Sequence, residues 1–148
     1  IMKKGTRVAL GTDGPASNND LDVFGELKAA ALLHKGVRLD PSIMPAREVL
    51  FMALEAGAGA AGLKDQIGTV KVGGKADLIL LDFDKPHLTP VYNYVSHLVY
   101  AASGADVDTT IVDGVVLMEN RQLKSVDEEE VKAKVREIAG KIRKFSAK

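Results

Sequence analysis

The sequence predicts an α/β protein made of two consecutive units, and three observations predict it. A short apolar run at residues 7–10 ends in a glycine-bounded turn and precedes a helical pattern, which is the order of elements in a parallel α/β fold. After Gly68 the pattern changes from helix-rich to strand-rich. A last segment, at residues 125–144, returns to helical spacing. We therefore expect one unit over residues 1–67 and another over 68–148.

The first unit is predicted to open with a buried strand at residues 7–10, Arg-Val-Ala-Leu. The turn at residues 11–15 follows, and the polar residues 17–20 offer N-caps whose oxygens accept bonds from free N–H groups of a helix. Gly36 is the predicted end of that helix. The apolar positions at helical spacing are Leu21, Phe24, Leu27 and Ala31.

A second helix is predicted to begin near Pro45, since proline suits the first turn of a helix. Its apolar face contains Val49, Leu50, Ala53 and Leu54. The small residues at 57–63 predict a short, tightly packed helix. They do not form a phosphate-binding loop, because no Lys-Ser or Lys-Thr follows the glycines.

The second unit is predicted to contain two β-hairpins. The first joins residues 69–72 to residues 76–82 through Gly73-Gly74. The second joins residues 109–112 to 115–118 through Asp113-Gly114, a pair typical of a type I′ turn. Between them, residues 92–102 fit either a short helix or an extended stretch.

The last segment predicts a helix with signals at both ends. Ser125 and Glu128 have the spacing of a capping box, and acidic residues at the start and basic residues at the end complement the helix dipole. One apolar stripe runs along it and is expected to pack on the rest of the chain, with a dimer contact as the alternative. Its members are Val131, Val135, Ile138 and Ile142.

The composition excludes several classes of function. The 148 residues carry 20 basic and 20 acidic side chains, so the basic surplus of a nucleic-acid-binding protein is missing. The absence of cysteine excludes disulfides, thiolate metal sites and cysteine nucleophiles, and suits a cytoplasmic protein. No apolar run approaches the roughly 20 residues that span a bilayer. We expect a soluble, cytoplasmic protein with neither nucleic acid nor membrane as a partner.

Asp13 is the strongest candidate for chemistry. It follows the predicted strand, and functional groups of parallel α/β folds gather at the carboxyl ends of strands. Its carboxylate can bind a metal or act as a general base, and the alternative is a turn residue that caps the next helix. Its neighbours Thr12, Ser17 and Asn18 are candidates for holding it in place, with ordinary turn and capping chemistry as the alternative.

The three histidines are scattered. His34 is expected at the surface near a helix end and His87 in an exposed loop. His97 is expected to be buried and hydrogen-bonded, with contact to a functional site as the alternative. A catalytic metal needs three or more protein ligands, which these residues with Asp13 do not supply. The cytidine-type zinc deaminases are excluded, because their signature contains two cysteines.

Three motifs resemble one known family. Residues 11–22, Gly-Thr-Asp-Gly-Pro-Ala-Ser-Asn-Asn-Asp-Leu-Asp, resemble the end of the last barrel strand in the amidohydrolase superfamily. They are most similar to the branch that contains the 5-methylthioadenosine/S-adenosylhomocysteine deaminases and the triazine chlorohydrolases. Residues 74–79, Gly-Lys-Ala-Asp-Leu-Ile, resemble the start of the C-terminal β-sandwich of such enzymes. Residues 86–88 and 96–100 are similar to the deaminase group.

The resemblance implies a (β/α)8 barrel with a small β-sandwich. Residues 1–67 would be the last strand and helices of the barrel, and residues 68–148 the C-terminal part of the sandwich with a terminal helix. It also implies one divalent metal, zinc or alternatively iron, held by histidines and by an aspartate that matches Asp13. That aspartate would be metal ligand, substrate contact and catalytic proton acceptor for the metal-bound water, which then attacks the amine-bearing carbon of adenine.

The sequence departs from the family because it contains no His-x-His motif and no counterpart of the earlier barrel strands. We expect the chain alone to be inactive, as a truncation, a proteolytic product or one part of a split enzyme. The parent enzyme would deaminate S-adenosylhomocysteine, 5-methylthioadenosine or adenosine. The alternatives are a related amidohydrolase acting on guanine, a triazine or another aminated heterocycle, and a non-catalytic assembly module. A homo-oligomer or association with the missing N-terminal portion is expected.

Overall fold

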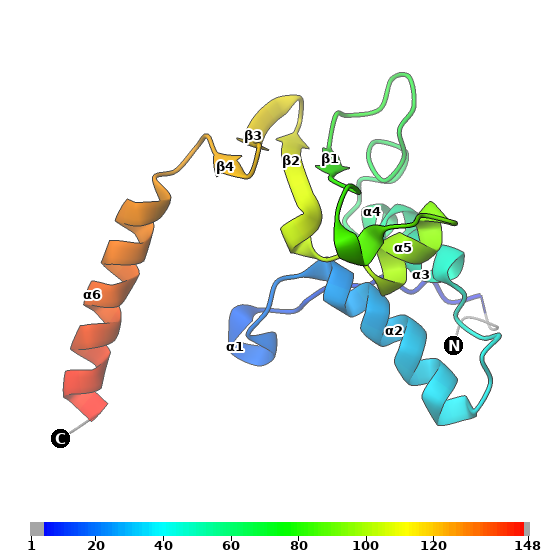
Figure 1. Ribbon diagram of the computed structural model, residues 1–148, viewed down its shortest axis with the longest axis horizontal. Coiled ribbons are helices and arrows are strands. Elements are labelled where there is room, and N and C mark those ends of the chain that lie inside the picture. The colour runs from blue at the N-terminus through cyan, green and yellow to red at the C-terminus, as the bar shows by residue number, and fades with distance from the viewer. Residues whose placement is uncertain (1–4, 147–148) are drawn as a thin grey trace.

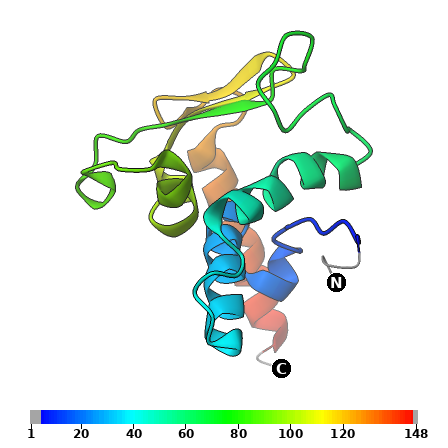
Figure 2. The same cartoon turned by 90° about the vertical axis from the view of Figure 1, so that its right-hand side faces the viewer.

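The computed structural model describes residues 5–146. A four-stranded antiparallel sheet lies at one end, and the helices of the first half of the chain lie beneath it (Figures 1 and 2). The core is formed where three helices meet: α2 (Val23–Arg38), α3 (Ala46–Ala53) and α5 (Tyr94–Tyr100). Its buried members are Leu27, Ala31, Val49 and Val99. Since Val99 lies in the second predicted unit, this core draws on both units.

Helix α2 begins where Asp22 caps it. One carboxylate oxygen of Asp22 accepts a hydrogen bond from the amide of Phe24 at 2.9 Å. The helix passes through Gly36 and ends at Arg38, and the next residue, Leu39, adopts a left-handed conformation with φ of 53°. The caps predicted at residues 17–20 and the end predicted at Gly36 were therefore wrong by a few residues.

Residues 7–10 do not form the predicted strand. A strand exists only where a neighbouring strand pairs with it, and the described sheet is made entirely from residues after Gly68. The amide of Leu10 instead donates a hydrogen bond to the carbonyl of Met52 in α3, at 3.3 Å. The segment therefore lies against α3 without belonging to a sheet.

The second helical segment is divided into α3 and α4 (Glu55–Ala60). Leu54 separates them, with backbone angles of −93° and −84° that lie outside the helical region. The predicted short helix of small residues corresponds to α4, which buries Ala56 and Ala58. A Cβ at Gly57 would make ordinary van der Waals contact with the carbonyl oxygen of Met52, at 3.6 Å.

The strands follow one another in the order β1 (Leu78–Leu81), β2 (Val107–Val112), β3 (Val115–Glu119) and β4 (Gln122–Leu123). The β2–β3 hairpin was predicted correctly: Asp113 and Gly114 both have positive φ, at 49° and 82°, as a type I′ turn requires. The hairpin predicted between residues 69–72 and 76–82 was wrong, because β1 pairs with β2. No described residue pairs with the other edge of β1.

Between the strands lie η2 (Pro86–Leu88), α5 and η3 (Gly104–Asp106). Residues 92–102, for which the sequence allowed either a helix or an extended stretch, contain α5. Asn93 caps it by accepting a hydrogen bond from the amide of Ser96 at 3.0 Å.

The terminal helix α6 (Glu128–Ser146) forms as predicted but stands away from the body of the molecule (Figure 1). Asp127 caps it in place of the predicted Ser125–Glu128 box, accepting bonds from the amides of Glu129 and Glu130. The residues of its apolar stripe are 46–59% exposed, so the predicted packing on the rest of the chain was wrong for the described residues. None of the described helices combines the length and apolarity needed to cross a bilayer.

Candidate functional site

Asp13 lies in the loop between the extended residues 7–10 and the short helix α1 (Pro15–Asn18). Its backbone is left-handed, with φ of 59°, a conformation that aspartate tolerates better than most residues. The amide of Gly14 donates a hydrogen bond to Oδ1 of Asp13 at 2.7 Å. Gly14, not Asp13, is the N-cap of α1. The Asp13 carboxylate is therefore exposed, fixed by its neighbour, and not used to cap a helix.

The three residues expected to support Asp13 form hydrogen bonds around the same loop. The hydroxyl of Thr12 donates to the backbone carbonyl of Asp13 at 3.1 Å, and the amide of Ser17 donates to the carbonyl of Gly14 at 2.9 Å. The side-chain amide of Asn18 donates to the carboxylate of Glu26 in α2 at 2.8 Å. These bonds shape the loop, and the role of the three residues in supporting a metal-bound Asp13 stays a prediction.

The end of the loop is attached to α2 and, through it, to the second half of the chain. Asp20 accepts a hydrogen bond from the amide of Asp22 at 2.9 Å. While Oδ1 of Asp22 caps α2, its Oδ2 accepts a hydrogen bond from the amide of Gly104 at 2.9 Å. Sequence reasoning missed this bond, since no local pattern pairs residues so far apart.

The histidines lie apart from one another. His34 is exposed, as expected. His97 is partly buried; its Nδ1 lies 3.0 Å from the carbonyl oxygen of Asn93, and its ring is tilted against Phe83 at 6.4 Å between centroids. Within residues 5–146 no group of three or more histidine or acidic side chains is arranged to hold a metal ion.

His87 takes part in a cluster that the sequence analysis did not predict. Its Nε2 lies 3.1 Å from the carboxylate of Asp106, which is 2% exposed, and Nζ of Lys85 lies 3.3 Å from the same carboxylate. The amide and hydroxyl of Ser103 also donate to it. Burial raises the pKa of Asp106, but the hydrogen bonds from His87, Ser103 and Lys85 outweigh burial and lower it to about 2. The cluster holds η2 against η3 and is a structural feature.

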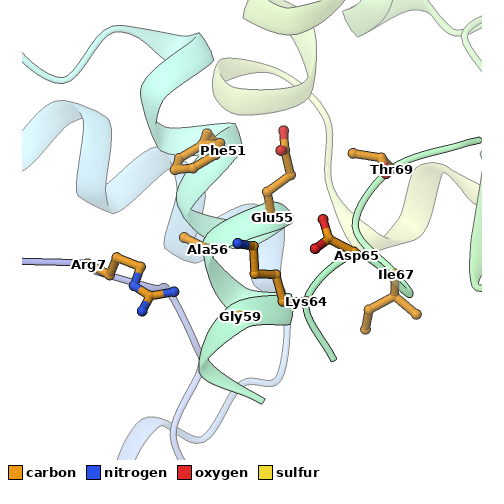
Figure 3. A pocket seen from close by; sticks show the side chains of 9 residues that line it. All are labelled: Arg7, Phe51, Glu55, Ala56, Gly59, Lys64, Asp65, Ile67 and Thr69. Atoms are coloured by element: carbon orange, nitrogen blue, oxygen red, sulfur yellow. The ribbon is translucent and has the colours of Figure 1, made fainter. Parts of the chain in front are cut away.

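A hollow lies beside α3 and α4, and the Arg7 side chain points toward α4 (Figure 3). Two basic and two acidic side chains line it: Arg7, Lys64, Glu55 and Asp65. These charges balance, so the hollow has no strong preference for an anion or a cation. Asp13 is not among its lining residues, and the hollow is distinct from the candidate site.

The family model for the amidohydrolase family matches residues 1–117. The chain belongs to the amidohydrolase family. The resemblance inferred from residues 11–22 is therefore confirmed. The two predicted units, residues 1–67 and 68–148, stay a prediction.

Relatives of this amidohydrolase chain are named as deaminases. The chain is 54% identical over 142 residues to a 5-methylthioadenosine/S-adenosylhomocysteine deaminase of Acetivibrio thermocellus, covering 96% of this chain and 33% of that protein. It is 54% identical over 139 residues to a 5′-deoxyadenosine deaminase of Methanosarcina acetivorans, covering 94% and 32%. The chain thus spans about a third of the length of these relatives and corresponds to their C-terminal portion.

Solved structures agree with the family. An adenosine deaminase from Xanthomonas campestris with bound zinc superposes with a TM-score of 0.92 at 36% identity, covering 97% of this chain and 33% of that one. The atrazine chlorohydrolase TrzN from Arthrobacter aurescens, complexed with zinc, gives a TM-score of 0.81 at 28% identity, covering 90% and 30%. The described residues therefore have the fold of the matching third of these amidohydrolase structures.

The described side chains can be compared with the ligands that a catalytic zinc or iron ion needs. Asp13 offers an exposed carboxylate, which is a suitable ligand for zinc or iron. A mononuclear catalytic site needs three or more protein ligands, and the described residues form no such group around Asp13. The described residues therefore fit one ligand position of a metal site, and they cannot form the site by themselves.

Proposed function

We propose that this amidohydrolase chain supplies Asp13 to the metal site of a hydrolase that removes the amino group of an adenine nucleoside as ammonia. The observation that carries the proposal is the Asp13 carboxylate itself: it is exposed, held by the amide of Gly14, and free of any capping duty in α1. A carboxylate held in this way is available both as a metal ligand and as a proton acceptor.

The reaction is a hydrolysis in which water adds to the amine-bearing ring carbon and ammonia leaves. Asp13 would accept the proton released by the attacking water, and its fixed loop would keep the carboxylate in one position. A divalent metal, when bound, supplies the activated water by lowering its pKa. The remaining ligands would come from a (β/α)8 barrel portion, either on a longer chain or on a companion polypeptide.

The names of the relatives support the substrate class. Relatives at 54% identity are named for deamination of 5-methylthioadenosine, S-adenosylhomocysteine and 5′-deoxyadenosine. Zinc is the proposed metal, because the similar deaminase and chlorohydrolase structures contain it, and iron is the alternative. A cytoplasmic location is proposed from the absence of cysteine.

Two alternatives have observations of their own. The chlorohydrolase likeness, at 28% identity, supports a related enzyme acting on a triazine, guanine or another aminated heterocycle. The exposed stripe on α6 supports a non-catalytic assembly module, or a homo-oligomer.

The first experiment is an intact mass, a denaturing gel and a total metal analysis of the purified sample. A companion polypeptide with about one metal per pair supports the proposal. Ammonia release from 5-methylthioadenosine, S-adenosylhomocysteine and 5′-deoxyadenosine would then be assayed. We expect Asp13→Asn to reduce it at least about 100-fold and the exposed Asp84→Asn to leave it unchanged. A lone metal-free chain of 15.8 kDa would mean that this chain has no deaminase activity of its own.

A further inference from the structure

We propose that Asp22 is a positioning residue for Asp13. The Asp22 carboxylate binds the start of α2 to η3 in the second half of the chain, and the Asp13 loop is attached to the start of α2. The inference rests on the proposed function of Asp13. It adds a residue that contacts neither metal nor substrate and acts through the loop.

Asp22 uses its two oxygens for two different donors. Oδ1 accepts from the amide of Phe24 and so caps α2, while Oδ2 accepts from the amide of Gly104, 82 residues further along the chain; both distances are 2.9 Å. The approach is close enough that a Cβ on Gly104 would lie 3.3 to 3.4 Å from three atoms of the Asp22 carboxylate. Glycine at 104 therefore leaves just enough room for the bond.

The backbone of Gly104, which binds Asp22, is itself held by hydrogen bonds. Its carbonyl accepts a hydrogen bond from the guanidinium of Arg121 at 2.9 Å, which also donates to the carbonyl of Val107 at 2.8 Å. At the other end of η3, Asp106 is buried and bound by Ser103, and by His87 and Lys85 from the η2 region. The peptide that binds Asp22 is thus fixed on both sides.

The Asp13 loop is attached in turn to the start of α2. Asn18 in α1 donates to Glu26 in the first turn of α2 at 2.8 Å. Asp20 accepts from the amide of Asp22 itself at 2.9 Å. Because α1 follows directly after Gly14, whose amide holds the Asp13 carboxylate, a shift of the first turn of α2 would be passed to that carboxylate.

Two variants separate this bond from ordinary helix capping. Asp22→Asn keeps one oxygen to cap Phe24, since asparagine is as good an N-cap as aspartate, but its NH₂ group cannot accept from Gly104. Gly104→Ala leaves the Asp22 carboxylate chemically intact and crowds it with the added Cβ. Asp84→Asn, at an exposed position, is the matched control.

The test is amide hydrogen exchange and amide NMR spectra of the full chain, with no metal required. In both variants we expect the amide of residue 104 to exchange roughly 10-fold faster or more, because its charge-assisted hydrogen bond to Asp22 is lost. We also expect the Gly14 amide resonance to shift, since that amide binds the Asp13 carboxylate. The amides of Val49 and Val99 in the core should keep their exchange rates, which excludes general unfolding.

Two results would overturn the inference: an unchanged exchange rate at the amide of residue 104, or a faster rate there with an unmoved Gly14 resonance. In the second case Asp22 only stabilises the contact between α2 and η3 and does not position Asp13. Failure of the proposed function is separate, because it appears as ammonia release that survives Asp13→Asn. Where ammonia release is measurable, Asp22→Asn should lower kcat with little change in KM or metal content.

Discussion

The carboxylate of Asp106 and the imidazole of His87 lie 3.1 Å apart, although the two residues are 19 positions apart in the sequence. Asp106 is buried, and His87 is half exposed. Together with Lys85 and Ser103, His87 keeps the pKa of Asp106 at about 2 despite burial. This cluster joins η2 to η3, the element that binds Asp22.

The first prediction concerns acid stability. The folded-state pKa of Asp106 lies below its usual value of 3.8. Its contribution to the free energy of unfolding is therefore fully present above about pH 5 and is lost as pH falls toward 2. The shift corresponds to about 2 kcal/mol. Asp106→Asn should therefore cost about that much at pH 7, and the difference from wild type should shrink by pH 2. Urea unfolding across this pH range measures it, and a difference that is constant with pH would contradict the assignment. Asp84→Asn should parallel the wild type.

The second prediction concerns the backbone at Asp13. With φ of 59°, alanine at this position should cost about 1–2 kcal/mol of unfolding free energy, whereas asparagine and glycine should cost little. Urea unfolding of Asp13→Ala, Asp13→Asn and Asp13→Gly at pH 7 gives the comparison. Equal stability of all three would mean that the loop is not left-handed there. The result also shows why Asp13→Asn is the suitable variant for metal and activity measurements.

The third prediction concerns Lys35, whose Nζ donates to the carbonyls of Ala31 and Met44 and to the hydroxyl of Tyr100. Lys35→Met keeps the aliphatic chain but removes the side-chain donor of these three partly buried hydrogen bonds. We expect a loss of about 1–3 kcal/mol in urea unfolding. The exposed Lys28→Met is the control and should change stability by less than about 0.5 kcal/mol. Equal effects of the two substitutions would show that the Lys35 bonds contribute nothing.

The fourth prediction concerns the α6 stripe. Since Ile138 is 46% exposed, Ile138→Ser should change the thermal stability of the isolated chain by less than about 0.5 kcal/mol. Leu88→Ala, at a fully buried position, should cost about 2–5 kcal/mol under the same conditions. A loss above about 1 kcal/mol for Ile138→Ser would reveal a surface that covers the stripe, and scans at several protein concentrations would show whether that surface belongs to a second copy.

Elements with local signals were predictable from the sequence. The β2–β3 hairpin follows from Asp113-Gly114 between two β-branched runs, because the turn type is encoded by the two central residues. Helix α6 follows from its charge pattern and spacing, although the capping residue was Asp127 and not Ser125. For the same reason Asp13 could be singled out as a candidate, since its glycine-flanked turn is a local pattern.

The features that the sequence did not predict depend on partners that lie far away in the chain. Residues 7–10 have the composition of a strand, but no strand forms without a neighbour in a sheet. Strand β1 was assigned to the wrong hairpin, because its partner β2 lies about 25 residues further on and nothing local marks the pairing. The bonds of Asp22 to Gly104 and of Asp106 to His87 were missed for the same reason.

The outer edge of β1 affects how the isolated chain behaves in solution at high concentration. Its four residues, Leu-Ile-Leu-Leu, are all apolar, and no described residue pairs with that edge. Unpaired apolar edges of this kind recruit strands from other molecules. The isolated chain should therefore aggregate through intermolecular β-pairing as its concentration rises, and a charged residue placed at Ile79, in the middle of the edge, should delay precipitation.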